Sequence, residues 1–492
     1  MYVALLAMTV VIYALVCAAY LRHRAASWFH PLTIYLAFHG IVFVVRPILS
    51  YVYGYTFIYR LYLFSPGDYA KAMTLVVVNL GLVSFAFASL RWGGARLVFR
   101  SDRFSAAELQ NLARPLWLAA LPLLPLAAYS LYQAWALRGS AQDTLDMDAS
   151  TGTIINTSGN GYVQFGYMAL CTLLPLLAWT GRFRPWWVAA AGFTAMLMAG
   201  VGIRGPVISL LVCLATVYLY ARGRRAPDWR IAVVAAAGVL VFNAVGADRG
   251  QQIRTLIGGE RAAMTQGPDQ LAPLEGMDLG NLEFAEYLVD KVPRSTRTYE
   301  YFLDNLQIAT EPIPRALWSG KPIGQPVRLF YLFDYGYPIG MTRSLPGEGW
   351  TQLGLAGVAL WCGLCGAMCG AVYNRFARGA QKPLEIAFYA AFLSTLIVFY
   401  RDGLLITLLR QGVFFVVAPL LWWVAARVTG AANAADLRLR AGLAPTRRQR
   451  RAEAAEELGA PPPPVEAPAA TRDRALPRSR RHPRRPVPSP RG

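Results

Sequence analysis

The stretch GLAGVALWCGLCGAMCGAV, from Gly354 to Val372, decides the fold of this chain. It contains no charged residue, and its length is close to the roughly 20 apolar residues that an α-helix needs to cross a bilayer. The rest of the sequence agrees, because 55% of its 492 residues are hydrophobic and only 15% are charged. Ordinary soluble proteins carry about 25% charged residues. The composition therefore excludes a soluble globular enzyme and predicts a polytopic membrane protein.

Similar apolar runs recur along the chain and predict an all-α protein with about eleven transmembrane helices. The first run has no basic residues before it and no small-residue cleavage site after it, so we interpret it as a retained helix and not as a signal peptide. The predicted spans are 2–20, 28–50, 69–90, 115–137, 161–181, 185–203, 206–221, 231–247, 350–373, 384–401 and 403–427.

Basic residues indicate how these spans are oriented. Arg22 and Arg24 follow the first span, and further basic clusters follow the third, fifth, seventh, ninth and eleventh spans. Short loops rich in Lys and Arg stay on the cytoplasmic side of a membrane. With eleven spans, all of these loops fall on that side, which predicts an N-terminus outside and a C-terminal tail in the cytoplasm.

The chain is predicted to have four parts. Residues 1–247 hold the first eight spans, 248–349 form a large extracytoplasmic loop, 350–427 hold spans nine to eleven, and 428–492 form a tail. The tail has 14 arginines against 6 acidic residues and a run of four prolines, which predicts disorder. Contact with anionic lipid headgroups suits such a tail better than nucleic-acid binding.

Within the large loop, two stretches have the periodicity of amphipathic helices. They are NLEFAEYLVDKV and STRTYEYFLDNLQ, which are separated at Pro293. An exterior loop of this length is usually functional.

Charged residues at or near the predicted outer face form the most informative pattern. A charge in or beside a membrane span is expensive and is a candidate functional residue. For any single one, a structural role and a functional role are equally good explanations, but several arginines converging on one face indicate an anionic ligand such as a lipid phosphate or diphosphate. The residues are Arg46, Arg204, Asp248, Arg249, Glu348, Arg401, Asp402 and Arg410.

Glu348 lies in the stretch SLPGEGW, just before the Gly-rich span. A carboxylate beside arginines can be their counter-ion, or it can be a general base that takes a proton from an attacking hydroxyl. The sequence leaves both roles open.

Two motifs resemble the oligosaccharide repeat-unit polymerases, the O-antigen polymerase family. The first is PIPRALWSGKP at 312–322, and the second is TRSLPGEGWTQLGLAGV at 342–358, which runs into a span. The resemblance implies a GT-C-like membrane glycosyltransferase of the bacterial plasma (inner) membrane, which joins oligosaccharide units carried on undecaprenyl diphosphate into a surface polysaccharide at the outer face.

The resemblance also implies roles for individual residues. Glu348 would be the catalytic residue, and neither a metal nor another cofactor is expected. Trp318 and Tyr335 would stack on sugars, or would equally well belong to an aromatic belt at the membrane interface. The partners would be the lipid-linked oligosaccharide and membrane lipid, with a chain-length regulator protein as a candidate and no nucleic acid. The residues that would bind the diphosphate and substrate are Arg46, Arg204, Arg249, Arg315, Lys321, Arg343, Arg401 and Arg410.

Four alternatives remain. An O-antigen ligase would place a His in the large loop, but the histidines here are His23, His30, His39 and His482. A transporter or flippase would show repeat symmetry and short loops, and a non-catalytic scaffold would act through its tail. Asp146 and Asp148 could hold a metal as a DxD pair, which is a weak pattern.

The cysteines offer a second metal hypothesis. Cys362, Cys365 and Cys369 share one helical face, but they alternate with glycines, which favours a helix-packing surface over a metal site.

Overall fold

The computed structural model of the protein describes 1–99, 106–137, 145–148, 153–156, 163, 165–200, 204–228, 272, 274–276, 279–311, 313, 317–318, 320–321, 325–336 and 342–431. The chain divides into two units, Met1–Ala435 and Asp436–Gly492, and the second unit lies outside the described residues. So do most of the predicted tail and the first part of the predicted large loop.

The described part of the chain is helical apart from one hairpin. Seven helices are long and apolar enough to cross a membrane. They are α1 (Tyr2–Arg22), the continuous Pro31–Tyr53 segment, α5 (Asp68–Trp92), α6 (Ala106–Leu137), α15 (Ser344–Arg378), α16 (Pro383–Asp402) and α17 (Leu405–Val428). The Pro31–Tyr53 segment consists of α2 (Pro31–His39), the π-helix η1 (Gly40–Val45) and α3 (Arg46–Tyr53).

Shorter helices occupy three more of the predicted spans. These are η3 (Gly166–Ala169) with α8 (Leu170–Thr180), then α9 (Pro185–Gly200) and α10 (Arg204–Ala221). The predicted span 231–247 lies outside the described residues. An α-helical membrane protein is therefore confirmed, while the count of eleven spans stays a prediction.

A two-stranded antiparallel hairpin interrupts the helices within the predicted acidic loop. It pairs β1 (Leu145–Asp148) with β2 (Thr153–Asn156), with Asp146 opposite Ile155 and Asp148 opposite Thr153.

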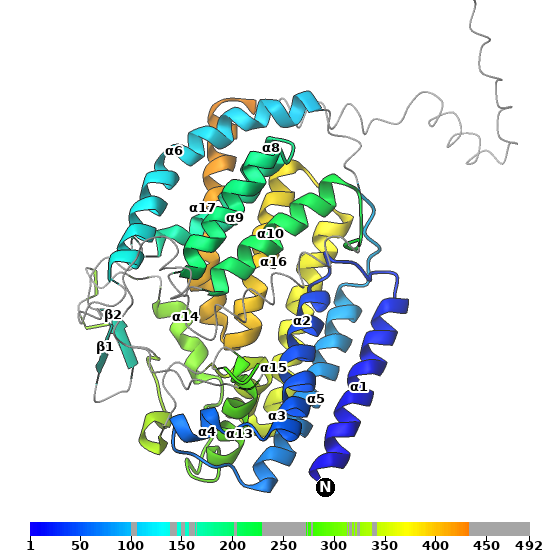
Figure 1. Cartoon of the computed structure of the whole chain (residues 1–492), viewed down its shortest axis with the longest axis vertical. Helices are drawn as coiled ribbons and strands as arrows, with labels where there is room; N and C mark the ends of the chain where they lie inside the picture. The colour runs from blue at the N-terminus through cyan, green and yellow to red at the C-terminus, as the bar shows by residue number, and fades with distance from the viewer. Residues whose placement is uncertain are drawn as a thin grey trace, which may run out of the picture. The chain divides into compact units, whose positions relative to one another are not determined.

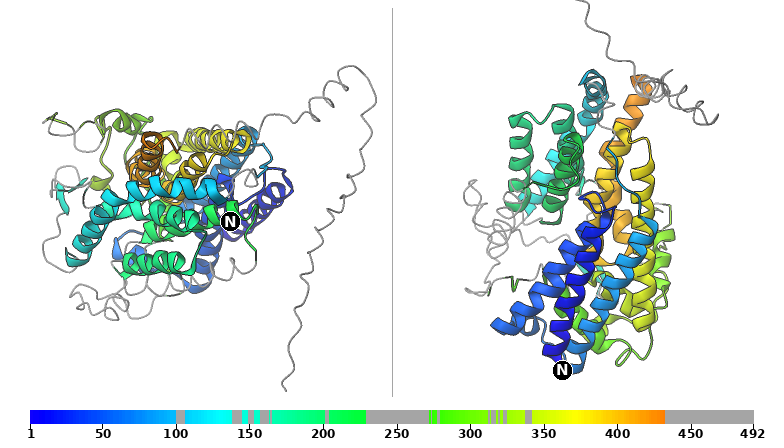
Figure 2. Two further views of the ribbon diagram at one scale, coloured as in Figure 1. Left: turned by 90° about the horizontal axis from the view of Figure 1, so that it is seen from above. Right: turned by 90° about the vertical axis from the view of Figure 1, so that its right-hand side faces the viewer.

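The helices of the first unit form two groups joined by α16. One group contains α1, α2, α5 and α15, and the other contains α6, α8, α9 and α10, with α17 packed on both α6 and α16. The right-hand view of Figure 2 separates the green helices of the second group from the blue helices of the first.

Small residues allow α15 and α5 to pack very closely. A Cβ atom on Gly366 would lie 2.5 Å from the carbonyl oxygen of Phe85, and one on Gly370 would lie 2.5 Å from that of Ser89. Cys362, Cys365 and Cys369 are buried in the same helix and are free thiols. The predicted packing face is therefore present, although Gly363 faces open space.

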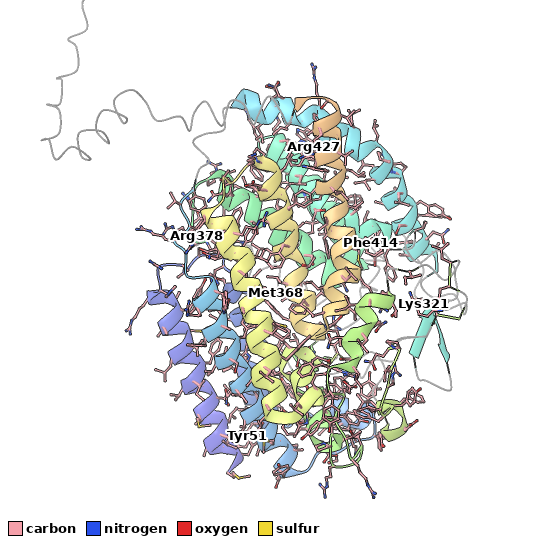
Figure 3. The ribbon with its side chains drawn as sticks, turned by 180° about the vertical axis from the view of Figure 1, so that it is seen from behind. Tyr51, Lys321, Met368, Arg378, Phe414 and Arg427 are labelled. Carbon is pink, nitrogen blue, oxygen red and sulfur yellow. The ribbon has the colours of Figure 1, made fainter. Side chains whose placement is uncertain are left out.

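The basic loops meet at one end of the helices. Arg24 donates to the carbonyl of Gly94, and the amide of Trp28 donates to the carbonyl of Arg225. Tyr373 donates to the carbonyl of Ala95. Figure 3 shows Arg378 and Arg427 at this end, and Tyr51 at the other.

Toward the opposite end lie short elements of the predicted large loop. These are α13 (Asn281–Lys291), η5 (Leu303–Leu306), α14 (Gln307–Thr310) and η6 (Leu332–Tyr335). Figure 1 shows α13 beside α3 and α4 (Phe57–Leu61) at the lower end of the helices. The predicted helix at NLEFAEYLVDKV is confirmed as α13, which is almost completely buried.

The second predicted helix, at STRTYEYFLDNLQ, is wrong. Arg297, Tyr301 and Phe302 have positive φ angles, and only the short η5 forms there. The physical reason lies in α15, because two of its backbone carbonyls accept hydrogen bonds from amides of this segment.

Candidate active site

A break within α15 creates the candidate site. Leu353 (φ −162°, ψ 37°) and Gly354 (φ 58°, ψ −141°) are not helical, so α15 consists of a short N-terminal segment, 344–352, and a long segment, 355–378. A Cβ atom on Gly357 would lie 2.2 Å from the carbonyl oxygen of Gly349. Residues eight apart in a straight helix are about 12 Å apart along its axis. The N-terminal segment is therefore folded back against the long one.

The break also exposes backbone carbonyls that a continuous helix would satisfy. The amide of Glu300 donates to the carbonyl of Thr351 at 2.9 Å, and the amide of Tyr301 donates to that of Gln352 at 3.1 Å. The amide of Phe302 donates to the side-chain oxygen of Gln352 at 2.5 Å. These bonds account for the non-helical backbone at 300–302, where Tyr301 and Phe302 have φ angles of 49° and 63°. Strained backbone of this kind is concentrated at functional sites.

Glu348 lies at the centre of this arrangement and is fully buried. Its carboxyl oxygens lie close to those of Glu300 and Asp304, with one oxygen of each residue within 4.8 Å of the others. Arg343 is the cation of the group, and its Nη1 donates to Glu300 at 2.6 Å and to Glu348 at 3.1 Å. Three acidic groups thus face one guanidinium, and we call these four residues the acid cluster.

The sequence predicted Glu348 but missed Glu300 and Asp304. The two acidic residues are four apart in STRTYEYFLDNLQ, where a helix would have placed them on its solvent face. Among the described residues, these three carboxyl groups form the set that could ligate a metal ion. Arg343 already supplies positive charge there.

Arg401 is the penultimate residue of α16, and it lies immediately beside the N-terminal segment of α15. The amide group of Asn281 donates to the carbonyls of both Thr342 and Arg401, at 2.8 and 3.0 Å. At Gly403, which has φ +83°, an added Cβ atom would lie 2.9 Å from Cβ of Glu348. Nε of Arg401 is buried, and it has no hydrogen-bond partner among the described residues. The backbone of Arg401 therefore lies next to the acid cluster, and the Nε atom of this arginine is a donor without a partner in the described part of the chain.

Arg46 has a different environment, because it is fully buried and paired. Its Nε lies 2.9 Å from both carboxylate oxygens of Glu283, and its guanidinium also donates to the carbonyls of Leu274, Glu275 and Gly276. This network ties α3 to α13. The predicted contact of Arg46 with a diphosphate would have to compete with all of these partners.

Two more acidic residues belong to the surroundings of Arg46. Burial raises the pKa of Glu286 to about 8, and the negative charge of Glu283 acts in the same direction. The hydroxyl of Tyr59 donates a 2.6 Å hydrogen bond to Glu286, which partly opposes this increase in pKa. Burial acts in the same sense on Glu275, but amide donors, among them those of Phe57 and Thr56, outweigh it and lower the pKa of this carboxyl.

A third group forms around Glu311. Nε of Arg410 donates to Glu311 at 2.6 Å, and Nζ of Lys321 lies 3.9 Å from the same carboxylate. Burial opposes the effect, but Arg410 lowers the pKa of Glu311 below its ordinary value. Lys321 also donates to the carbonyls of residues 311 and 313.

The remaining predicted residues are only partly described. The side chain of Trp318 is 37% exposed, and the carbonyl of Tyr335 accepts a hydrogen bond from Tyr287. Arg204 begins α10 and its side chain is not described, while Arg249 and Arg315 lie outside the described residues. The predicted substrate-binding cations that the structure describes therefore fall into three groups. Of these cations, only Arg343 and Arg401 adjoin Glu348.

Comparisons with known proteins add no relatives to this description. No family model, no curated protein and no solved structure matches the chain.

Proposed function

We propose that this protein is a membrane glycosyltransferase that polymerises oligosaccharide repeat units carried on a lipid diphosphate. In this proposal, Glu348 takes the proton of the acceptor hydroxyl while the new glycosidic C–O bond forms. The bond between the anomeric carbon and the phosphate oxygen breaks, and the lipid diphosphate leaves with the electron pair of that bond. A leaving group of this kind needs a positive charge near it.

The observation that carries the proposal is a buried acid beside an arginine whose Nε atom has no hydrogen-bond partner in the described part of the chain. Glu348 is 0% exposed, and the end of α16 that carries Arg401 packs against its helix segment. The guanidinium fork suits phosphate oxygens and keeps its charge when it is partly desolvated. The site therefore offers both groups that the reaction requires.

The contacts of Arg343 support a base over a counter-ion role for Glu348. Arg343 makes a two-pronged contact with Glu300, through Nη1 at 2.6 Å and Nη2 at 3.0 Å. Its contact with Glu348 is a single bond at 3.1 Å. Because Glu300 already neutralises Arg343, the charge of Glu348 is not needed for that purpose.

The proposed setting is the bacterial plasma membrane. The basic loops meet at the end of the helices opposite the acid cluster, and the positive-inside rule assigns that end to the cytoplasm. The acid cluster would then face outward, where lipid-linked saccharides are polymerised. The N-terminus would also be outside, the basic tail would be cytoplasmic, and undecaprenyl diphosphate would be the lipid carrier.

The proposal is tested in a strain from which the gene has been deleted and to which variants are returned. Glu348→Gln and Arg401→Gln should each abolish long surface polysaccharide on gels, and single repeat units should accumulate on the lipid carrier. Glu311→Gln is the matched control, because it removes a carboxylate of the same loop outside the acid cluster. Normal chain lengths in the Glu348→Gln strain, at normal protein levels, would refute the proposed base.

A further inference from the structure

The acid cluster divides into a neutral pair and a second pair. Glu300 and Arg343 form the neutral pair, through two parallel hydrogen bonds of 2.6 and 3.0 Å. Their charges cancel in a geometry that is among the strongest available to these side chains. Asp304 and Glu348 remain, and Nη1 of Arg343 is 4.0 Å from Asp304 and 3.1 Å from Glu348.

Gln352 supplies the other polar contact of this second pair. Its Nε2 lies 2.5 Å from Oε1 of Glu348, 3.0 Å from Oδ2 of Asp304 and 3.2 Å from Oε2 of Glu300. The orientation of the amide is fixed, because its oxygen accepts a hydrogen bond from the amide of Phe302. An amide nitrogen carries only two hydrogens. Gln352 therefore cannot donate to all three oxygens at once.

Asp304 and Glu348 approach each other in a buried site. One carboxyl oxygen of each lies within 4.8 Å of the other, both groups contact Nε2 of Gln352, and the two residues are 4% and 0% exposed. Two buried carboxylates this close repel strongly, and a proton held between them removes the repulsion. That proton also provides the donor that Gln352 cannot supply.

We propose that Asp304 and Glu348 hold one proton between them and act as a single carboxyl–carboxylate pair. The role in catalysis rests on the proposed function. Before the reaction the pair carries one negative charge and one shared proton. The acceptor hydroxyl then transfers its proton to Glu348, which makes the pair neutral, and one proton must be released before the next cycle. Asp304 is thus a positioning residue that holds the base in its reactive charge state.

Other charged groups near Glu348 must be included in any test by pH. Glu300 and Arg343 face it from the surrounding loop, and Cys365 faces it from the long segment of α15. Arg401 and Asp402 adjoin it at the end of α16. From α13, the apolar side chains of Ala285 and Leu288 approach the segment at Gly347, and the side-chain amide of Asn281 binds the carbonyls of Thr342 and Arg401 beside it.

The test uses infrared spectroscopy of the purified full-length protein in detergent near pH 7. A protonated carboxyl has a carbonyl stretch that a carboxylate lacks. We expect Asp304→Asn and Glu348→Gln each to lose the signal of one protonated carboxyl relative to the unmodified protein, because each variant leaves a lone carboxylate with Gln352 and Arg343. Glu311→Gln should lose none. A signal unchanged in Asp304→Asn would overturn the proposal, and Asp304→Ser is the second variant if Asp304→Asn does not accumulate.

A second readout separates this proposal from the proposed function. If the protein elongates glycans, the acidic limb of the activity profile of Asp304→Ala should move to higher pH by about one unit, because the carboxylate of Glu348 loses the shared proton that stabilises its charged form. An unmoved limb would contradict the role of Asp304 in holding the base. If the infrared result is obtained but the unmodified protein elongates nothing, the shared proton stands and the glycosyltransferase assignment fails.

Discussion

Replacement of Arg46 tests whether this arginine has a structural role or binds a ligand. Arg46 and Glu283 are 0% and 1% exposed and lie 2.8 Å apart at their closest atoms. Arg46→Met leaves a buried carboxylate without its cation, and breaking such a pair costs about 3–5 kcal/mol. Arg46→Met combined with Glu283→Gln removes both charges, and replacing a whole buried pair with neutral groups is often close to neutral.

The double variant should therefore be more stable than the single one. Its recovery is incomplete, because the carbonyls of residues 274–276 lose their donor, and a buried unsatisfied polar group costs about 1–3 kcal/mol. We expect a coupling energy of at least about 2 kcal/mol in a double-mutant cycle, measured by unfolding the purified protein in detergent.

Arg410 and Glu311 provide the matched control. Their side chains are 51% and 25% exposed, so the same cycle should give less than about 1 kcal/mol. A coupling energy near zero for Arg46 and Glu283 would refute the structural role. A stable Arg46→Met variant that makes no polymer would instead return Arg46 to the substrate site.

Three further predictions concern packing, pH and the break in α15. Gly370→Ala should lower the free energy of unfolding by about 1–3 kcal/mol, because the new Cβ atom would lie 2.5 Å from the carbonyl oxygen of Ser89. Gly363 faces open space, so Gly363→Ala should change the free energy of unfolding by less than about 0.5 kcal/mol. Thermal unfolding in detergent compares the two variants. Glu286 binds its proton more tightly in the folded protein, so stability should fall by up to about 1.4 kcal/mol per pH unit as pH rises from about 5 to 8, and Glu286→Gln should remove that slope in unfolding measurements across this range. Gly354→Ala should cost about 1–3 kcal/mol and stop polymer formation, because its φ of 58° and ψ of −141° strain an L side chain; wild-type stability and chain length in this variant would show that the break is not required.

The apolar helices were predictable because their signal is local. A run such as Gly354–Val372 indicates a membrane helix by itself, and the periodicity of 281–292 was sufficient to predict α13. The Gly and Cys face of α15 was also readable from the spacing of small residues, although Gly363 takes no part in it.

The acid cluster was only partly predictable because it depends on the break at 353–354. The sequence Gln-Leu-Gly-Leu contains no proline, and the amphipathic pattern of 295–307 favours a helix. Once the break frees the carbonyls of Thr351 and Gln352, the amides of Glu300 and Tyr301 bind them, and the helix at 295–307 is lost. Glu300 and Asp304 are buried only as a result of that exchange.

The partners of the arginines were also beyond the sequence. Arg46 and Glu283 are separated by 237 positions, so no local pattern connects them. A convergence of arginines was read as an anion site, but carboxylates brought in by tertiary contacts already pair with several of these arginines.

The most direct measurement is elongation by the purified full-length protein in detergent. The probe is the lipid-linked saccharide fraction extracted from the deletion strain, and the products are sized on gels. We predict that the unmodified protein lengthens the saccharide and that Glu348→Gln does not. Lengthening in detergent cannot come from a flippase, since no bilayer is present to be crossed. If the unmodified protein leaves every saccharide at its starting length, or if Glu348→Gln lengthens them equally well, the proposed active site is wrong.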